Sequence, residues 1–508
     1  MDADYYMVGG ISLTSQKGFW EPILWNYLDN PSGLPHPSHA YWMPLASILA
    51  AAGMALTRQF NIHGAQAGMI VLGASISPLT AYLSFKLNHE RWSAWFSGGL
   101  AIASGFYLAY LPTTDTFGVY MLLGTSLLLL VPTQNPSRLI ALLLPWLVGI
   151  LAGLMHLARA DGLLWLVIAV VVVVLLPGKA LRGKGFPVRL LAFRIMACLT
   201  GYLMIMAPWM ARNYLVFGSW LSPAGSKVLW LTDYDDLYIY PASLLTLQRW
   251  IGQGLMPILT ARLYAVGQNI QTFLAVQGEI ILVPLIIAGL WRLRQDRRVQ
   301  VGIGAWLLTV FVMTIIFPLQ GARGGFFHSG AALQPLFWAV TPAGLLRFIE
   351  WGGRYRNWRE KEAIIVFQLG ILFLLVILSG FLVYQRVVKP AGAANMWDAP
   401  LEFYQGVNKA LDRASTDTTQ RVMVNNPPGF FLASGRQAIA IPDGGVDTLI
   451  DAAMRFHTCI LILESNHPVG LEELYRTPEQ YQQLIRIGSY EDAFIYWIKP
   501  CSPVVADS

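Results

Sequence analysis

The residues of this sequence that could do chemistry are charged side chains that interrupt long apolar runs. They are, in chain order, Asp2, Asp4, Asp115, Arg159, Asp161, Arg212, Arg323 and His328. A carboxylate can act as a general base, and the planar guanidinium of arginine binds phosphate through paired hydrogen bonds. If these side chains gather on one face, they predict an acid–base centre beside a phosphate-binding site.

Each residue also has a purely structural interpretation. The Thr-Thr-Asp run that ends at Asp115 is good capping chemistry for a helix that starts there. Arg159 and Asp161 could form a local ion pair in a tight turn, and Arg212 could fix a helix end at the membrane interface. The accompanying histidines are better explained as interfacial hydrogen-bonding groups than as metal ligands; they are His36, His39 and His328.

The composition indicates where these groups must work. The chain has 508 residues, of which 55% are hydrophobic and 13% are charged, and its mean hydropathy is +0.50. Soluble domains average about 25% charged residues, so most of this chain must lie in lipid. The 18 Trp, 21 Tyr and 24 Phe fit a membrane protein, because aromatic rings collect at both interfaces. The net charge of +6 therefore predicts basic cytoplasmic loops and no nucleic-acid partner.

Ten segments are apolar and long enough to span a bilayer, which takes roughly 17–25 residues in a helix. We predict spans near 65–86, 91–110, 116–133, 138–156, 160–177, 189–208, 270–291, 301–319, 329–346 and 363–385. The shorter apolar run Pro44–Thr57 predicts a re-entrant or interfacial helix. With this count the dense Lys and Arg clusters all fall in alternate loops, as they do on the cytoplasmic side of membrane proteins.

This topology places the candidate residues on the outer face and divides the chain into four parts. Residues 1–64 form a first outer loop with amphipathic and re-entrant helices. Residues 65–385 form the transmembrane bundle, with a large outer loop over 209–269. Residues 386–395 form a linker, and residues 396–508 form a small extracytoplasmic α/β domain. That domain is predicted from alternating strands and helices, at 421–425, 437–442, 446–457, 459–464 and 470–485.

Four stretches resemble motifs of the GT-C membrane glycosyltransferases, and within them the branch of the protein O-mannosyltransferases and lipid A aminoarabinose transferases (glycosyltransferase 39/83-like). The stretches are Asp2-Ala3-Asp4-Tyr5-Tyr6, His36-Pro37-Ser38-His39-Ala40-Tyr41-Trp42-Met43-Pro44, Thr114-Asp115-Thr116 and Pro208-Trp209-Met210-Ala211-Arg212-Asn213-Tyr214. The first is similar to the acidic motif that opens the family's first outer loop, and the third to its second acidic position. The family often has Asp-Glu where this chain has Asp-Ala-Asp, so Asp2 and Asp4 both stay candidates.

The resemblance implies a mainly α, polytopic helix bundle of GT-C type with a small outer α/β domain. Family members have a transmembrane helix before the acidic motif. Here Met1 is followed directly by that motif, with no signal peptide and no leading apolar helix. We therefore expect about 10 transmembrane helices in this chain and a first family helix that is missing from it.

The resemblance also implies the reaction. It is an inverting transfer of a sugar from a polyprenyl-phosphate donor to a lipid, glycan or protein acceptor, at the outer face of a plasma membrane that we expect to be prokaryotic. Asp4 or Asp2 would be the base that deprotonates the acceptor, and Asp115 would orient the reacting groups. A lipid donor explains why the chain lacks a GxxxxGK[ST] phosphate loop and other soluble motifs.

The remaining roles follow from the same resemblance. Arg212, then Arg159 and Arg323, would hold the donor phosphate. Contacts to the substrates are expected from His39, Tyr41, Tyr6 and His328.

We predict no cofactor and no metal. Oligosaccharyltransferase relatives use a metal ion, and here Asp2, Asp4 and Asp115 could supply oxygen ligands, but the closer branch works without a catalytic metal. The alternative function is a polytopic secondary transporter or lipid flippase. Transporters usually place their charges near mid-membrane in two repeated halves, whereas these charges fall at the outer ends of helices, which favours the enzyme.

Overall fold

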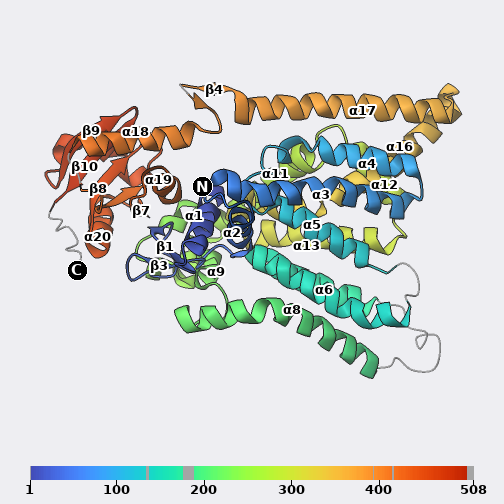
Figure 1. Cartoon of the computed structure of the whole chain (residues 1–508), viewed down its shortest axis with the longest axis horizontal. Helices are drawn as coiled ribbons and strands as arrows, with labels where there is room; N and C mark the ends of the chain where they lie inside the picture. Colours follow the sequence, from blue (N-terminus) through green and yellow to red (C-terminus); the bar gives the residue numbers. More distant parts are fainter. Residues whose placement is uncertain (1, 133–136, 176–187, 393, 415–416, 500–508) are drawn as a thin grey trace.

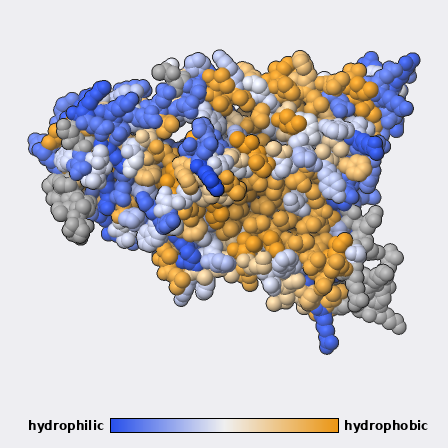
Figure 2. Space-filling view, viewed as in Figure 1, coloured by the Kyte–Doolittle hydropathy of each residue, from blue (hydrophilic) through white to orange (hydrophobic). Residues whose placement is uncertain are grey.

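The computed structural model describes residues 2–132, 137–175, 188–392, 394–414 and 417–499. Apolar helices fill one end of the molecule and a mixed α/β domain forms the other, with helices α1 (Asp2–Thr14) and α2 (Leu45–Thr57) between them (Figure 1). Figure 2 shows a broad hydrophobic surface over the helical end and a mainly hydrophilic surface over the α/β domain. This division confirms the predicted mainly α fold with a small C-terminal α/β domain.

Within the described residues, six helices are long and apolar enough to cross a membrane. They are Ile62–Asn88 (α3), Leu139–Ala158 (most of α6), Val188–Phe217 (α8), Arg297–Ile316 (α13 and the turn after it), Pro318–Arg356 (α14 to α16) and Glu360–Val388 (α17 and its last turn). A helix suits a bilayer because each backbone amide and carbonyl finds its partner within the segment. These six correspond to six of the ten predicted spans.

The other four predicted spans form shorter helices, so the number of transmembrane helices stays a prediction. They are α4 (Arg91–Ile102), α5 (Phe117–Leu130), α7 (Leu163–Val174) and α12 (Val283–Arg292). The predicted span 91–110 stops being helical at Ile102, and Gly105 then turns the chain with a left-handed φ of 53°. The residues between Ile102 and α5 are therefore free to form the loop that carries Asp115.

The predicted span 270–291 is interrupted in its middle. Helix α11 (Leu255–Thr272) continues into a π-helical turn at Phe273–Gln277, and the chain then leaves the helix before α12 begins. Glu279 and Ile280 both have positive φ values there, 44° and 62°, which a continuous α-helix does not allow. The Glu279 carboxyl is fully buried and accepts a hydrogen bond from the indole of Trp338 at 2.7 Å.

The predicted amphipathic helix of the first outer loop is α1, and most of its surface is buried by other parts of the protein. Helix α2, which occupies the segment predicted to be re-entrant, packs against one side of α1. A Cβ atom on Gly9 would lie only 2.4 Å from the Ser47 hydroxyl of α2, so glycine permits this close approach. Much of α1 is therefore covered by protein.

The α/β domain has a six-stranded sheet with the order β2-β7-β6-β8-β10-β9. Its strands are β2 (Ile23–Leu24), β6 (Arg421–Val424), β7 (Ala438–Ala440), β8 (Thr458–Leu463), β9 (Leu484–Tyr490) and β10 (Ala493–Ile498). The predictions of β6, β7, β8 and the helix α20 (Val446–Phe456) are confirmed. The predicted helix over 470–485 is wrong: only α21 (Glu472–Arg476) and short turns form there, because Pro478 breaks the segment.

The edge strand β2 comes from the first outer loop, which the sequence did not predict. It pairs in parallel with β7, with Ile23 opposite Ala438. The Tyr27 hydroxyl donates to the carbonyl of Ala440, and the Arg421 guanidinium donates to the carbonyl of Leu34 at 3.0 Å. The first outer loop and the C-terminal domain are therefore one folded unit, joined to the bundle through α17 and the hairpin β4 (Pro390–Ala391) and β5 (Ala394–Asn395) in the predicted linker.

Small residues determine how closely two long helices of the bundle approach. Helix α6 (Arg138–Ala158) packs along α8, and a Cβ on Gly149 would lie 2.0 Å from the backbone oxygen of Cys198. A Cβ on Gly201 would lie 2.2 Å from the backbone oxygen of Trp146. Backbone cannot yield as a flexible side chain can, so these glycines fix the contact, as small residues do in membrane helix pairs.

We expect Gly149→Ala to lower the thermal stability of the purified chain by several degrees, because overpacking costs about 1–3 kcal/mol. The matched control is Gly304→Ala in α13, where a Cβ would meet nothing within 4 Å. That variant should be as stable as the wild type, or slightly more stable because alanine favours a helix. Equal unfolding temperatures for both variants would contradict the close packing of α6 and α8.

Candidate active site

A cavity of about 820 Å³ lies between the first outer loop, the helix bundle and the long loop that follows α8. Its polar lining includes Asp2, Arg159, Asp161, Asn213, Arg323 and His328. Its aromatic lining includes Tyr6, Trp25, Tyr41, Trp42, Tyr234 and Trp220. Its apolar lining includes Leu163, Leu164, Met206, Val312, Met313 and Phe317. One cavity is therefore lined by charged groups, aromatic rings and an apolar wall.

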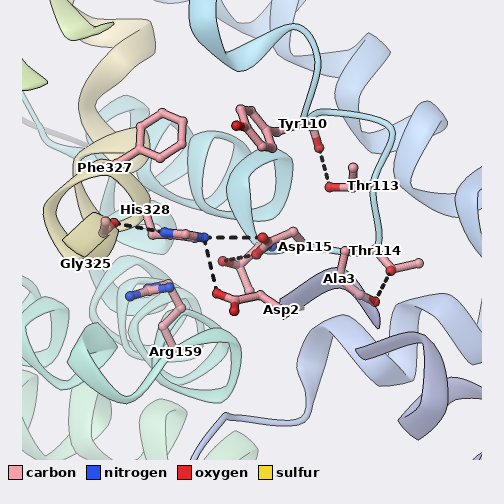
Figure 3. A network of polar contacts seen from close by, with 12 residues as sticks. Asp2, Ala3, Tyr110, Thr113, Thr114, Asp115, Arg159, Gly325, Phe327 and His328 are labelled. Carbon is pink, nitrogen blue, oxygen red and sulfur yellow. Dashed lines mark hydrogen bonds and ion pairs between the residues drawn. The ribbon is translucent and has the colours of Figure 1, made fainter. Parts of the chain in front are cut away.

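His328 connects the two acidic positions that the sequence singled out (Figure 3). Its Nε2 atom lies 3.2 Å from an Asp115 carboxylate oxygen and 3.8 Å from an Asp2 carboxylate oxygen. Its Nδ1 atom lies 2.9 Å from the carbonyl oxygen of Gly324. Since a carbonyl can only accept, Nδ1 carries a proton and Nε2 faces the two carboxylates.

Three separate elements supply this cluster. Asp2 lies in the first turn of α1, Asp115 lies just before α5, and His328 lies in the short helix α15 (Phe326–Gly330). The His328 ring stacks on Phe117 with centroids 4.1 Å apart, which fixes its orientation. The Asp115 carboxylate also accepts a hydrogen bond from the backbone amide of Thr116 at 2.5 Å. Asp115 is therefore not the helix cap that the sequence allowed: the N-cap of α5 (Phe117–Leu130) is Thr116, with no side-chain capping bond, and Asp115 lies one residue earlier, where it contacts His328.

The environment drives the pKa values of the two carboxyls apart. Burial would raise the pKa of Asp115, but His328 and the Thr116 amide outweigh burial and hold that pKa below its usual range. The side chain of Asp2 is 38% exposed, but it lines the cavity, and the surrounding protein desolvates it. This burial and the nearby charge of Asp115 raise the pKa of Asp2. Asp115 therefore favours the ionised form, and Asp2 is the more basic carboxylate of the two.

The donor set of this cluster fits a divalent cation. Asp2, Asp115 and His328 each offer one ligand atom, and these atoms lie within 4.8 Å of one another. The Nδ1 hydrogen bond of His328 to a carbonyl is the arrangement that fixes Nε2 as a metal ligand. Asp4, which the sequence offered as a further oxygen ligand, does not line the cavity.

Arg159 lines the cavity, but its charge is already paired. Its Nε donates to Asp161 at 2.9 Å, and Asp161 accepts a second hydrogen bond from the Ser329 hydroxyl at 2.6 Å. Burial would lower the pKa of Arg159, but the charge of Asp161 raises it, so the guanidinium stays protonated. This is the local ion pair that the sequence allowed, now placed on the cavity wall.

Arg323 lines the same cavity and makes no ion pair with a carboxylate among the described residues. Its guanidinium lies over the ring of Tyr234, 5.0 Å from the ring centroid. The backbone next to it is kinked, with a φ of 119° at Gly324, a value that favours glycine. Arg323 is thus a cation presented to the cavity from a kinked segment.

Four of the predicted site residues lie away from the cavity lining: Asp115, which contacts the lining residue His328, and Arg212, His39 and Asp4. Arg212 donates to the backbone oxygen of Phe19 at 3.0 Å and stacks over the ring of Trp209 at 4.8 Å. The His39 ring is fully buried and bonds to the Ser38 and Ser47 hydroxyls, and burial lowers its pKa to about 3.

Asp4 accepts a hydrogen bond from the Asn426 side chain of the C-terminal domain at 3.0 Å. Of the other predicted substrate contacts, Tyr6, Tyr41 and His328 line the cavity.

The sequence reasoning missed the aromatic wall and a buried carboxyl behind it. Trp25 and Trp42 pack with their ring centroids 3.9 Å apart, and both line the cavity. Trp42 belongs to one of the four stretches that resemble family motifs. Trp25 belongs to none of them, so only its being a tryptophan could have drawn attention to it. Behind this wall, Glu21 is buried and hydrogen-bonded to the Tyr5 hydroxyl.

Comparison with known proteins gives no match by sequence: no protein-family model and no curated protein matches the chain. Solved structures do match. Crystal structures of ArnT from Cupriavidus metallidurans align over 98% of this chain and 93% of their own, at 10% identity, with a TM-score of 0.56 when bound to undecaprenyl phosphate and 0.55 in the apo state. ArnT is the lipid A aminoarabinose transferase and a GT-C member. This chain has the GT-C fold.

A second protein with the GT-C fold also matches this chain. The oligosaccharyltransferase of Archaeoglobus fulgidus, in a crystal structure with Zn and sulfate, aligns over 94% of this chain at 14% identity with a TM-score of 0.56. This chain spans about two thirds of the length of that protein, 65% of its chain. The predicted resemblance to the GT-C fold is confirmed, and the cavity described above lies within that fold.

The buried Glu21 predicts how stability depends on pH. Burial raises the pKa of Glu21 well above its usual value. The neutral carboxyl therefore contributes fully to the free energy of unfolding below the unfolded-state pKa of about 4.3. This contribution is lost as the pH rises through the folded-state pKa. Between about pH 5 and pH 9, we therefore expect the unfolding temperature of the wild type to fall more steeply than that of Glu21→Gln. The amide of that variant mimics the neutral acid.

The control for this measurement is Glu402→Gln, because Glu402 is exposed in α18 (Ala399–Arg413). Its unfolding temperature should follow the wild-type pH profile. If Glu21→Gln and the wild type have parallel profiles, Glu21 is ionised in the folded protein and this account of its burial is wrong.

Proposed function

We propose that this chain is a membrane glycosyltransferase that moves a sugar from a polyprenyl-phosphate donor to an acceptor at the outer face of a prokaryotic plasma membrane. The observation that carries the proposal is the cluster of Asp2, Asp115 and His328 in a GT-C fold, in which Asp2 and His328 line the cavity and Asp115 contacts His328. A transporter would instead line a path through the bilayer with its charges. Here the charged residues that line the cavity include Asp2 of α1, and Figure 1 shows α1 between the helix bundle and the C-terminal domain. Placement at this end of the bundle supports the enzyme.

The cavity suits a lipid-linked phosphate. Its apolar wall is placed to receive a polyprenyl chain, and its charged end can receive the phosphate. Among the three arginines predicted for the phosphate, Arg323 is the best placed, because Arg159 is neutralised by Asp161 and Arg212 lies outside the cavity lining. The undecaprenyl phosphate bound by ArnT supports the same class of donor here.

Asp2 is the general base in this proposal. The acceptor hydroxyl or amine gives its proton to the Asp2 carboxylate while its oxygen or nitrogen attacks the anomeric carbon from the face opposite the phosphate. The bond between that carbon and the phosphate oxygen breaks, its electron pair leaves with the polyprenyl phosphate, and the anomeric configuration inverts. Arg323 stabilises the negative charge of the leaving phosphate, and the ionised Asp115 holds His328 in place.

A divalent cation is compatible with the same site. Asp2, Asp115 and His328 would hold it, and a bound cation would supply positive charge to stabilise the leaving phosphate. Extensive treatment with EDTA, followed by measurement of both donor turnover and bound metal, decides between the two versions. Our primary proposal expects turnover within about twofold of the untreated enzyme, well below the effect of losing a catalytic group; loss that Mn²⁺ or Mg²⁺ restores would replace it with the metal-dependent version.

The base assignment predicts that Asp2→Asn lowers turnover by about 10²-fold or more, the usual contribution of a general base. Release of free polyprenyl phosphate would be measured in liposomes with a panel of polyprenyl-phosphate sugars and acceptor extracts. Asp4→Asn is the matched comparison: it makes the same change two residues away and outside the cavity lining, and it keeps a side-chain oxygen that can accept from Asn426, so it should lose far less turnover than Asp2→Asn. Wild-type turnover of Asp2→Asn would refute the role of Asp2, and no release from any donor by the folded wild type would favour the transporter.

The phosphate assignment predicts that Arg323→Gln raises the KM for the donor by about 10- to 100-fold, since hydrogen bonds to charged groups contribute roughly 1.5–3 kcal/mol. The matched control is Arg386→Gln. Arg386 also contacts a tyrosine, Tyr110, but it lies outside the cavity lining. If the KM for the donor rises in Arg212→Lys but not in Arg323→Gln, Arg212 is the phosphate-binding residue and the assignment of Arg323 is wrong.

A further inference from the structure

The two carboxylates of the Asp-Ala-Asp motif contact different parts of the protein. We propose that Asp4 is a positioning residue: through its hydrogen bond to Asn426, the C-terminal domain holds α1 so that Asp2 faces the reacting centre. This inference rests on the proposed function of Asp2. It assigns to the C-terminal domain a role in the transfer step itself.

Helix geometry separates the two carboxylates. Successive residues of an α-helix are rotated by about 100°, so side chains two positions apart point in nearly opposite directions. Asp2 accordingly points toward His328, as Figure 3 shows, and Asp4 points to Asn426. A motif with one intervening residue can therefore serve two sites at once.

The amide of Asn426 is oriented by a second contact. Its side-chain oxygen accepts a hydrogen bond from the backbone amide of Gly429 at 3.2 Å and so caps helix α19 (Pro427–Ser434). The side-chain nitrogen is then left to donate, and it donates to an Asp4 carboxylate oxygen at 3.0 Å. One amide thus ties the start of α19 to the first turn of α1.

Apolar packing supports this polar contact. Leu432 of α19 packs against a small buried cluster that α1 and α2 share, which includes Met7 and Met54. The pairing of β2 with β7 joins the same domain to the first outer loop at a second place. The C-terminal domain is therefore docked by a hydrophobic contact and a shared sheet, and the Asp4–Asn426 bond sets the final orientation of α1.

The first turn of α1 is held from three sides. Asp2 faces His328 of the bundle, the carbonyl of Ala3 accepts a hydrogen bond from the Thr114 hydroxyl at 2.6 Å, and Asp4 accepts one from Asn426 (Figure 3 shows the first two contacts). Loss of one contact would let this turn shift. A displacement of about 1 Å at a reacting group can cost on the order of 10²-fold in rate.

The chain offers a matched control at the adjacent position. Asn425 is also an asparagine at the end of β6, but its side chain donates to the backbone oxygen of Asn466 within the C-terminal domain. Asn426→Asp keeps a capping oxygen and places a carboxylate against Asp4. Asn425→Asp adds the same charge one residue away from that contact. The double variant Asp4→Asn/Asn426→Asp restores a hydrogen bond with donor and acceptor exchanged.

The experiment combines turnover with hydrogen–deuterium exchange of residues 2–14, using the full chain in liposomes. We expect Asn426→Asp to lower kcat about tenfold, with a donor KM within about twofold of the wild type, and to speed amide exchange in α1. Asn425→Asp should match the wild type in both measurements. The double variant should recover most of the lost kcat and of the exchange protection, which a merely destabilised domain would not do.

Three results would overturn the proposal. They are wild-type kcat in Asn426→Asp, failure of the double variant to recover, and loss of activity in Asp4→Asn as severe as that in Asp2→Asn, which would make Asp4 a catalytic residue. If the wild type releases no polyprenyl phosphate, the proposed function fails instead. The exchange data then still decide whether Asn426 holds α1, because they do not depend on activity.

Discussion

The cost of burying charge in an apolar protein is the constraint on which the rest of this structure depends. Ionised groups in such a chain must be paired, hydrogen-bonded or placed at a water-filled cavity. Asp161 pairs with Arg159 and accepts from Ser329, and Asp115 is held by His328 and a backbone amide. The long helices carry many exposed apolar side chains, and the charged groups Asp2, Asp115, Arg159 and Asp161 lie together in the candidate site.

This arrangement makes the site a product of several loops. The long helices place the start of α5, the turn before α7 and the kinked segment around Gly324 near one another, and α1 then closes the cavity. Each of these segments breaks regular helix geometry, as the positive φ values at Gly105 and Gly324 show. Irregular backbone at this depth is tolerated where protein or a cavity surrounds it. The break after Ile102 that shortened the predicted span 91–110 thus also leads into the loop that carries Asp115.

The C-terminal domain forms one folded unit with residues of the first loop, next to the candidate site. Its sheet includes strand β2 from the first outer loop. Its Asp443 backbone amide donates to the carbonyl of Tyr238, in the long loop that follows α8, at 3.0 Å. Both loops also supply lining residues of the cavity, such as Trp25 and Tyr234. The domain therefore connects the walls of the cavity to each other. This connectivity gives a site built from loops a defined geometry.

The sequence by itself determined the membrane class, the apolar segments, the α/β nature of the C-terminal part and the residues that could do chemistry. Composition and local periodicity specify these features because each depends on neighbours in the chain. Only the tertiary structure decided that Asp2 faces the cavity while Asp4 faces Asn426, and that Arg323 lines the cavity while Arg212 does not. The partners in these contacts are up to 422 positions apart. Helix rotation and the packing of distant segments determine which of two similar side chains contacts such a partner. A local sequence pattern contains no information on the packing of distant segments or on the rotation that it imposes.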